Sequence, residues 1–125
     1  MERDLSATEL RVLGALVEKE ATTPEQYPLS VNALRAACNQ KSSRDPVMDL
    51  AEADVREALT SLTRRGLART ASGYGGRVSR FAHRFAEGLA APALGPDQVA
   101  LLCVLVLRGP QTVGELRAHS QRLHA

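Results

Sequence analysis

Seven arginines with almost no opposing acid stand in one stretch of the chain. The single acidic residue within residues 56–84 is Glu57, so that segment carries seven positive charges and one negative, or +6. Residues 1–55 hold six basic and ten acidic residues (−4), and residues 85–125 hold three of each, which gives the +2 of the whole chain. A local positive patch is typical of proteins that contact nucleic-acid phosphates. The arginines are Arg56, Arg64, Arg65, Arg69, Arg77, Arg80 and Arg84.

The pattern around these arginines predicts a helix followed by a hairpin. The helix is expected to begin near Asp49, with the apolar residues Val55, Leu59 and Leu62 on its inner face, and to end at Gly66. Residues 67–71 and 77–83 read as two strands, joined at residues 72–76 by a turn rich in glycine.

Two further helices are expected before this stretch. Ser6 to Glu9 forms a capping box, so a first helix should start at Ser6 and end near Thr22. Its inner face is predicted to be Leu10, Leu13, Leu16 and Val17, with Arg11, Glu18 and Lys19 off that stripe. Tyr27–Leu29 should be extended because a residue before proline disfavours the helical region. Ser30 should cap a second helix that runs to Cys38.

The same order then begins again. After a linker at residues 85–94, Pro96 opens a helix that should stop at Gly109, and Thr112 begins a second capping box. We therefore expect a winged helix-turn-helix domain at residues 1–84 and the first two helices of a second unit at residues 95–125. The fold class is mainly α with a small β-hairpin, and the chain is expected to be a fragment of a longer protein.

Composition excludes several classes of function. Only four residues are aromatic, which argues against single-stranded nucleic acid stacked on aromatic rings. The longest apolar run, Val99–Leu107, is shorter than the roughly 20 residues of a membrane helix, so no membrane association is expected. Cys38 and Cys103 stand alone in apolar surroundings and predict free thiols in a reducing cytoplasm.

No motif for catalysis or for cofactor binding is present. His83, His119 and His124 lack metal-ligand spacing with a cysteine or a carboxylate. The glycines at 73–76 lie between two predicted strands, whereas a phosphate-binding loop precedes a helix. The sequence therefore predicts a protein that is not an enzyme and that needs no cofactor and no metal.

Two functions from different classes fit the charged residues. The first is regulatory binding of double-stranded DNA through Arg56 and Arg64 on the third helix and through Arg69, Arg77 and Arg80 on the hairpin. The second is a protein–protein contact without nucleic acid. Acidic residues open the third helix and would repel phosphates, but they also complement a helix dipole. They are Asp49, Glu52, Asp54 and Glu57.

A polar loop and an apolar helix leave further alternatives open. The loop has no assigned role: it can hold a ligand or it can be structural. Val99–Leu107 is apolar on all sides. It is either buried between the two units or forms a homodimer contact that includes Val104 and Val106. The polar residues of the loop are Asn39, Gln40, Lys41, Ser42, Arg44 and Asp45.

Several strings in the chain resemble one family of bacterial proteins, the YceH-like family. The resemblance implies two tandem winged-helix domains in a longer chain and implies no particular activity. Ala51 departs from the small polar cap that family members often place before the third helix, and this departure bears on where that helix starts. The strings include Leu16–Glu20, Thr22–Pro24, Tyr27–Ser30, Asn32–Leu34, Cys38–Ser42, Arg44–Val47, Leu102–Leu105, Arg108–Thr112 and Gly114–Arg117.

Overall fold

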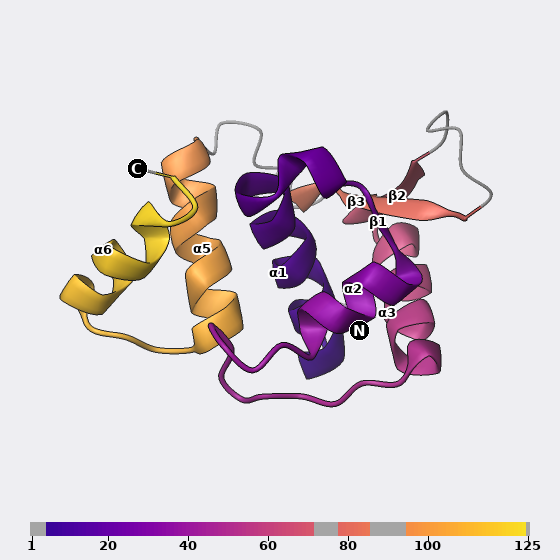
Figure 1. Ribbon diagram of the computed structural model, residues 1–125, viewed down its shortest axis with the longest axis horizontal. Helices are drawn as coiled ribbons and strands as arrows, with labels where there is room; N and C mark the ends of the chain where they lie inside the picture. The colour runs from indigo at the N-terminus through magenta and orange to yellow at the C-terminus, as the bar shows by residue number, and fades with distance from the viewer. Residues whose placement is uncertain (1–4, 72–77, 86–94, 125) are drawn as a thin grey trace.

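A computed structural model describes residues 5–71, 78–85 and 95–124. Helix α1 lies in the middle, with α5 and α6 on one side and α2, α3 and the sheet on the other (Figure 1). The elements in chain order are α1 (Ala7–Thr22), the 3-10 turn η1 (Pro24–Gln26), β1 (Leu29–Ser30), α2 (Val31–Cys38), α3 (Glu52–Arg64), β2 (Ala68–Ala71), β3 (Arg80–His83), α5 (Pro96–Arg108) and α6 (Val113–Gln121).

The expected helix caps are confirmed. The Ser6 hydroxyl accepts from the Glu9 amide, and the Glu9 carboxylate accepts from the Ser6 amide at 2.8 Å, which is the reciprocal pairing of a capping box. Thr112 and Glu115 repeat that pairing at the start of α6. Ser30 caps α2 by accepting from the Ala33 amide. These bonds satisfy amides that have no partner within the helix, so short polar motifs set where each helix begins.

The sheet contains one strand more than expected. The hairpin of β2 and β3 is antiparallel as predicted, and Thr70 lies opposite Phe81. The extended segment before α2 forms a third strand, because Leu29 pairs with Phe81 from the other side, giving the order β1-β3-β2. The predicted turn at residues 72–76, together with Arg77, lies outside the described residues.

Helix α3 ends as predicted but begins later than Asp49. Gly66 has a φ of +78° and donates to the Thr63 carbonyl, while the Leu67 amide donates to the Leu62 carbonyl at 2.9 Å. This is a Schellman ending. At the other end, Ala51 has no side chain with which to cap the helix, and the Asp54 carboxylate accepts from the Ala51 amide instead.

The core is apolar and surrounds α1 on both sides. It joins Leu16 of α1 and Leu34 of α2 to Leu62 of α3, and the same cluster includes Cys103 and Leu107 of α5. The protein is therefore mainly helical with a small three-stranded antiparallel sheet, an arrangement compatible with a winged-helix fold.

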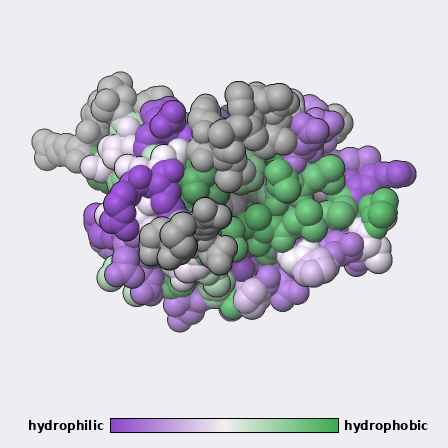
Figure 2. Space-filling model, turned by 180° about the vertical axis from the view of Figure 1, so that it is seen from behind, coloured by the Kyte–Doolittle hydropathy of each residue, from purple (hydrophilic) through white to green (hydrophobic). Residues whose placement is uncertain are grey.

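Helix α5 packs against α1 and α6 and leaves one apolar strip exposed. Ala100, Cys103, Val104 and Leu107 are buried, whereas Leu101 and Leu105 are 39% and 37% exposed. Figure 2 shows apolar side chains gathered on the part of the back face that belongs to the α5 and α6 end of the molecule. No single helix in the described ranges is long and apolar enough to cross a bilayer; by length and composition, the pair α5 and α6, bent by 110° at its break, passes as a broken span.

We predict different effects for alanine at two glycines. Gly66→Ala should lower the free energy of unfolding by about 1 kcal/mol, because a residue with a Cβ is strained at a φ of +78°. Gly114→Ala is the matched control: Gly114 lies in the first turn of α6 with no atom within 4 Å of an added Cβ, so alanine should be neutral or stabilising. Urea denaturation measures both. Equal effects at the two sites would contradict the assigned helix ending.

Candidate nucleic-acid interface

The outer face of α3 carries the side chains that can meet a partner. Arg56, Thr60 and Arg64 are exposed and follow one another at four-residue spacing, which places them on one stripe. Thr63 is exposed beside them. The inner residues Val55, Ala58, Leu59 and Leu62 are buried. Helix amphipathicity therefore orients two of the predicted arginines outward together.

Acidic neighbours already engage part of this positive charge. The Arg56 guanidinium lies 2.9 Å from the Glu52 carboxylate, one turn earlier, and both side chains are more than half exposed. Arg65, at the end of the helix, turns back towards α1 and lies 3.8 Å from Glu9. An exposed pair of this kind is worth less than about 1 kcal/mol, so Arg56 can exchange Glu52 for a phosphate at low cost.

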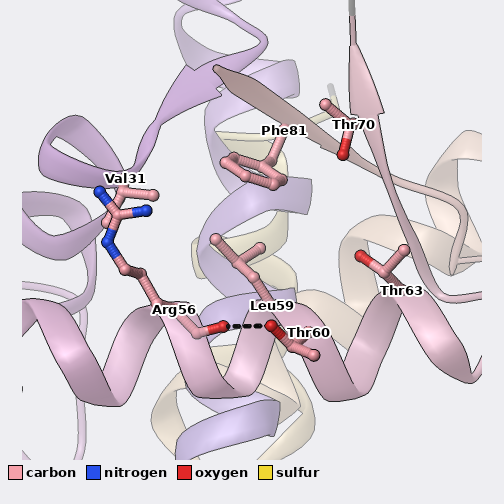
Figure 3. A pocket seen from close by; sticks show the side chains of 7 residues that line it. All are labelled: Val31, Arg56, Leu59, Thr60, Thr63, Thr70 and Phe81. Atoms are coloured by element: carbon pink, nitrogen blue, oxygen red, sulfur yellow. Dashed lines mark hydrogen bonds between the residues drawn. The ribbon is translucent and has the colours of Figure 1, made fainter. Parts of the chain in front are cut away.

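A shallow pocket of about 370 Å³ lies between α3 and the sheet (Figure 3). Buried Val31 and Leu59, together with Phe81, supply its apolar walls. The remaining lining residues are Arg56, Thr60, Thr63 and Thr70. The Thr60 hydroxyl donates to the Arg56 carbonyl at 3.0 Å. Such a surface can take a small apolar group, with hydroxyls and one cation around it.

The predicted hairpin arginines do not join this pocket. Side chains alternate along a strand, and Thr70 and Phe81 line the pocket. Arg69 and Arg80 therefore lie on the opposite face of the sheet. Arg69 is exposed, whereas Arg80 is partly covered and donates to the Pro28 carbonyl at 3.3 Å. Arg77 lies outside the described residues. The +6 segment thus supplies two separate surfaces.

The polar loop makes structural contacts along most of its length. Asn39 bonds both backbone groups of Leu50, accepting from its amide at 2.8 Å and donating to its carbonyl at 3.0 Å. Gln40 bonds the Ser42 carbonyl and accepts from Lys19. Lys41, Ser42 and Asp45 have exposed side chains, while the Asp45 amide donates to the Leu107 carbonyl of α5.

Arg44 is the buried centre of this loop. Its guanidinium binds both oxygens of the Glu18 carboxylate, at 2.7 and 3.1 Å, and also donates to the Ala37 carbonyl. Arg122, after α6, adds a third contact to Glu18 at 2.8 Å. Glu18 is completely buried. Burial opposes its ionisation, but the hydrogen bonds from Arg44 and Arg122 outweigh that effect and lower the pKa of Glu18 to about 2.

Sequence reasoning missed the burial of Glu18 and Arg11. Both were expected off the buried stripe of α1, yet they are 0% and 2% exposed because α5 covers that side of the helix. Arg11 donates to the Cys38 and Pro46 carbonyls, which fixes both ends of the loop. A charged residue that faces a second apolar helix interrupts the apolar periodicity of its own helix, so periodicity does not predict its burial.

Neither cysteine has the properties of a nucleophile. Cys38 and Cys103 are free and buried, and burial raises the pKa of each thiol to about 12. In the described part of the chain, no group of three or more His, Cys, Asp or Glu residues could hold a metal ion.

This geometry defines a mainly helical protein that presents an arginine- and threonine-bearing helix beside a small antiparallel sheet. Residues 5–125 match the family described as "Protein of unknown function, DUF480", and the chain belongs to that family. The YceH-like resemblance is consistent with this membership.

Its relatives include UPF0502 proteins from several Shewanella strains. Those of Shewanella sp. strain W3-18-1 and Shewanella putrefaciens are each 57% identical over 122 residues, which cover 97% of this chain and 55% of the relative. That of Shewanella loihica is 55% identical over 121 residues, covering 96% and 56%. The chain spans about half the length of these curated relatives.

Glu18→Gln should destabilise the protein by about 3 kcal/mol at pH 7, because Arg44 then remains buried without its counter-charge.

In the unsubstituted protein, the folded pKa of about 2 for Glu18 lies below the ordinary 4.5, so ionised Glu18 stabilises the fold above pH 4.5. That stabilisation is lost as the pH falls towards 2. Urea denaturation across this range should show the loss, and Glu18→Gln should lack its share of it.

Glu52→Gln is the control for this prediction, since it removes an exposed carboxylate from an arginine pair of similar length. Its cost should stay within about 0.5 kcal/mol. A Glu18→Gln protein as stable as Glu52→Gln at pH 7 would show that the buried pair is not important for the fold.

Proposed function

We propose that this protein binds double-stranded DNA as a YceH-like, winged-helix regulator, with α3 directed at the duplex. The observation that carries the proposal is the exposed stripe of Arg56, Thr60 and Arg64 on a helix whose other face is buried. An α-helix fits the major groove, where arginine can bind guanine and threonine can contact bases or phosphates. Arg69 and Arg80, on the other face of the sheet, can add phosphate contacts only if the duplex extends around its edge.

The charge distribution supports non-specific affinity as well. The positive charge of residues 56–84 attracts phosphates, while the paired Glu52 and the exposed Glu57 reduce that attraction locally. Binding should therefore be strongly salt-dependent and modest in strength. No covalent step is required of any side chain.

We predict that the chain binds a fluorescent DNA duplex at low salt and that affinity falls steeply between 50 and 200 mM salt. Arg64→Ala should reduce the slope of log affinity against log salt by about 0.9, because one phosphate contact is lost. Glu57→Gln should raise affinity by removing a negative charge from the same helix. Fluorescence anisotropy measures each value.

Arg117→Ala provides the control, because it removes an exposed arginine from α6, away from α3. Its slope should match that of the unsubstituted chain. If no duplex binding is detected at low salt, the proposal is wrong. If Arg117→Ala and Arg64→Ala weaken binding equally, α3 is not the contacting element.

A second candidate function is protein contact, favoured by the open side of α5. Leu101 and Leu105 of α5 are one turn apart and more than a third exposed. They form an apolar face on the α5–α6 hairpin. We propose that this face pairs with a second copy in a twofold dimer. Val104, named from the sequence as a contact, is 2% exposed and so is not available; Val106 is partly covered near Gly14.

The double substitution Leu101→Asp and Leu105→Asp should convert dimers into folded monomers, because two charges would be buried without partners across the contact. Ala118→Asp, at an exposed position of α6, should leave the association unchanged. Sedimentation velocity over a range of concentrations distinguishes these states. A monomeric unsubstituted chain at high concentration would refute self-association.

A further inference from the structure

The connection between α2 and α3 is far longer than a helix-turn-helix requires. It covers residues 39–51, which we call the bridging loop, whereas the usual turn has about three or four residues. The bridging loop leaves α2, passes over the end of α5 and returns to the start of α3 (Figure 1). It therefore links the proposed DNA-facing helix to the α5–α6 hairpin.

At its far end, the bridging loop is bonded to α5. The Asp45 amide donates to the Leu107 carbonyl at 2.9 Å, and Leu107 is among the last four residues of α5, whose carbonyls lack partners within the helix. The Arg108 guanidinium donates to the Ser43 hydroxyl at 2.8 Å. The loop thus caps the carboxyl end of α5.

At its near end, the bridging loop fixes the residue that precedes α3. The side chain of Asn39 bonds both the amide and the carbonyl of Leu50, and Arg35 of α2 adds a bond to the same carbonyl at 3.2 Å. The next residue, Ala51, is the N-cap of α3. The entry of the chain into α3 is therefore held by side chains from α2 and the loop, and not by a capping side chain at position 51.

Between these ends, the loop is bound to α1 by buried charges. Arg44 and Arg122 share the Glu18 carboxylate, so a loop residue and a residue after α6 depend on the same group. Arg11 bonds the carbonyls of Cys38 and Pro46. Bonded at both ends and in the middle, the loop forms a contiguous network that can transmit a change of position.

We infer that the bridging loop is a positioning device: the docking of α5–α6 on the loop sets the placement of α3. Displacement of the α5–α6 hairpin removes its bonds to Ser43, Asp45 and Glu18. The loop then moves, and the hold of Asn39 on Leu50 is loosened. The consequence for DNA affinity rests on the proposed function, whereas the mechanical coupling does not. Arg44 and Asn39 are positioning residues in this scheme and need no contact with DNA.

The test compares two double variants that each lose one positive charge. Ser43→Ala with Arg122→Met removes two bonds: the one from Arg108 of α5 to the Ser43 hydroxyl, and the one from Arg122 to the Glu18 carboxylate. Ser120→Ala with Arg117→Met is the matched control, because the Ser120 hydroxyl donates to the Arg117 carbonyl within α6, away from the loop. Ser43→Ala alone, which keeps the charge and removes one hydrogen bond, is the milder variant should the first fail to fold.

Two readouts separate the coupling from the proposed function. Amide hydrogen exchange at Leu50 and Val55 reports on the start of α3, and anisotropy reports on binding to a duplex at low salt. We expect the test variant to show faster exchange at both amides and an affinity lowered by on the order of 5-fold. The control should match the unsubstituted chain in both.

Unchanged exchange at Leu50 and Val55, or equal acceleration in the control, would overturn the coupling whatever happens to DNA binding. Faster exchange together with an unsubstituted chain that binds no DNA would leave the coupling standing and reject the proposed function. Faster exchange with undiminished affinity in a chain that does bind would show that the positioning of α3 does not extend to its DNA face.

Discussion

The arrangement of the whole molecule depends on one buried carboxylate. Glu18 lies on the central helix α1 with no exposed surface. Arg44 and Arg122, from distant parts of the chain, donate hydrogen bonds to its carboxylate. Burying such a group without partners would cost several kcal/mol, and Arg44 supplies the closest counter-charge from the bridging loop. This pairing holds the loop against α1, while the bond from the Asp45 amide to the Leu107 carbonyl holds it against α5.

The same constraint separates structural arginines from those available to a partner. Arg11 and Arg44 are buried, and their guanidinium groups donate hydrogen bonds to backbone carbonyls and, from Arg44, to Glu18. Arg56 and Arg64 remain on the surface of α3. Net charge counts all four alike, but only the exposed ones can neutralise phosphates. The acidic start of α3 then moderates the surface, since Glu52 already pairs with Arg56.

Local signals predicted most of the fold, because their causes are local. Capping boxes at Ser6 and Thr112, and the positive φ at Gly66, each involve residues within a few positions of one another. The burial of Glu18 could not be predicted in this way. It requires a second apolar layer, α5, which begins at Pro96, 78 residues after Glu18. The third strand was missed for the same reason, as Leu29 pairs with Phe81.

At the candidate site, a count of charges along the chain does not predict which surface each arginine occupies. Strand alternation places Arg69 on the sheet face opposite Thr70, whereas helical spacing aligns Arg64 with Arg56 on α3. Residues that are adjacent in the charge count therefore belong to different surfaces. A duplex placed on α3 would meet the pocket lined by Leu59 and Thr63 before it met the outer face of the sheet. Under the proposed function, any sequence preference would accordingly arise from α3, and the β2–β3 arginines would add base-insensitive phosphate contacts only where the duplex extends around the edge of the sheet.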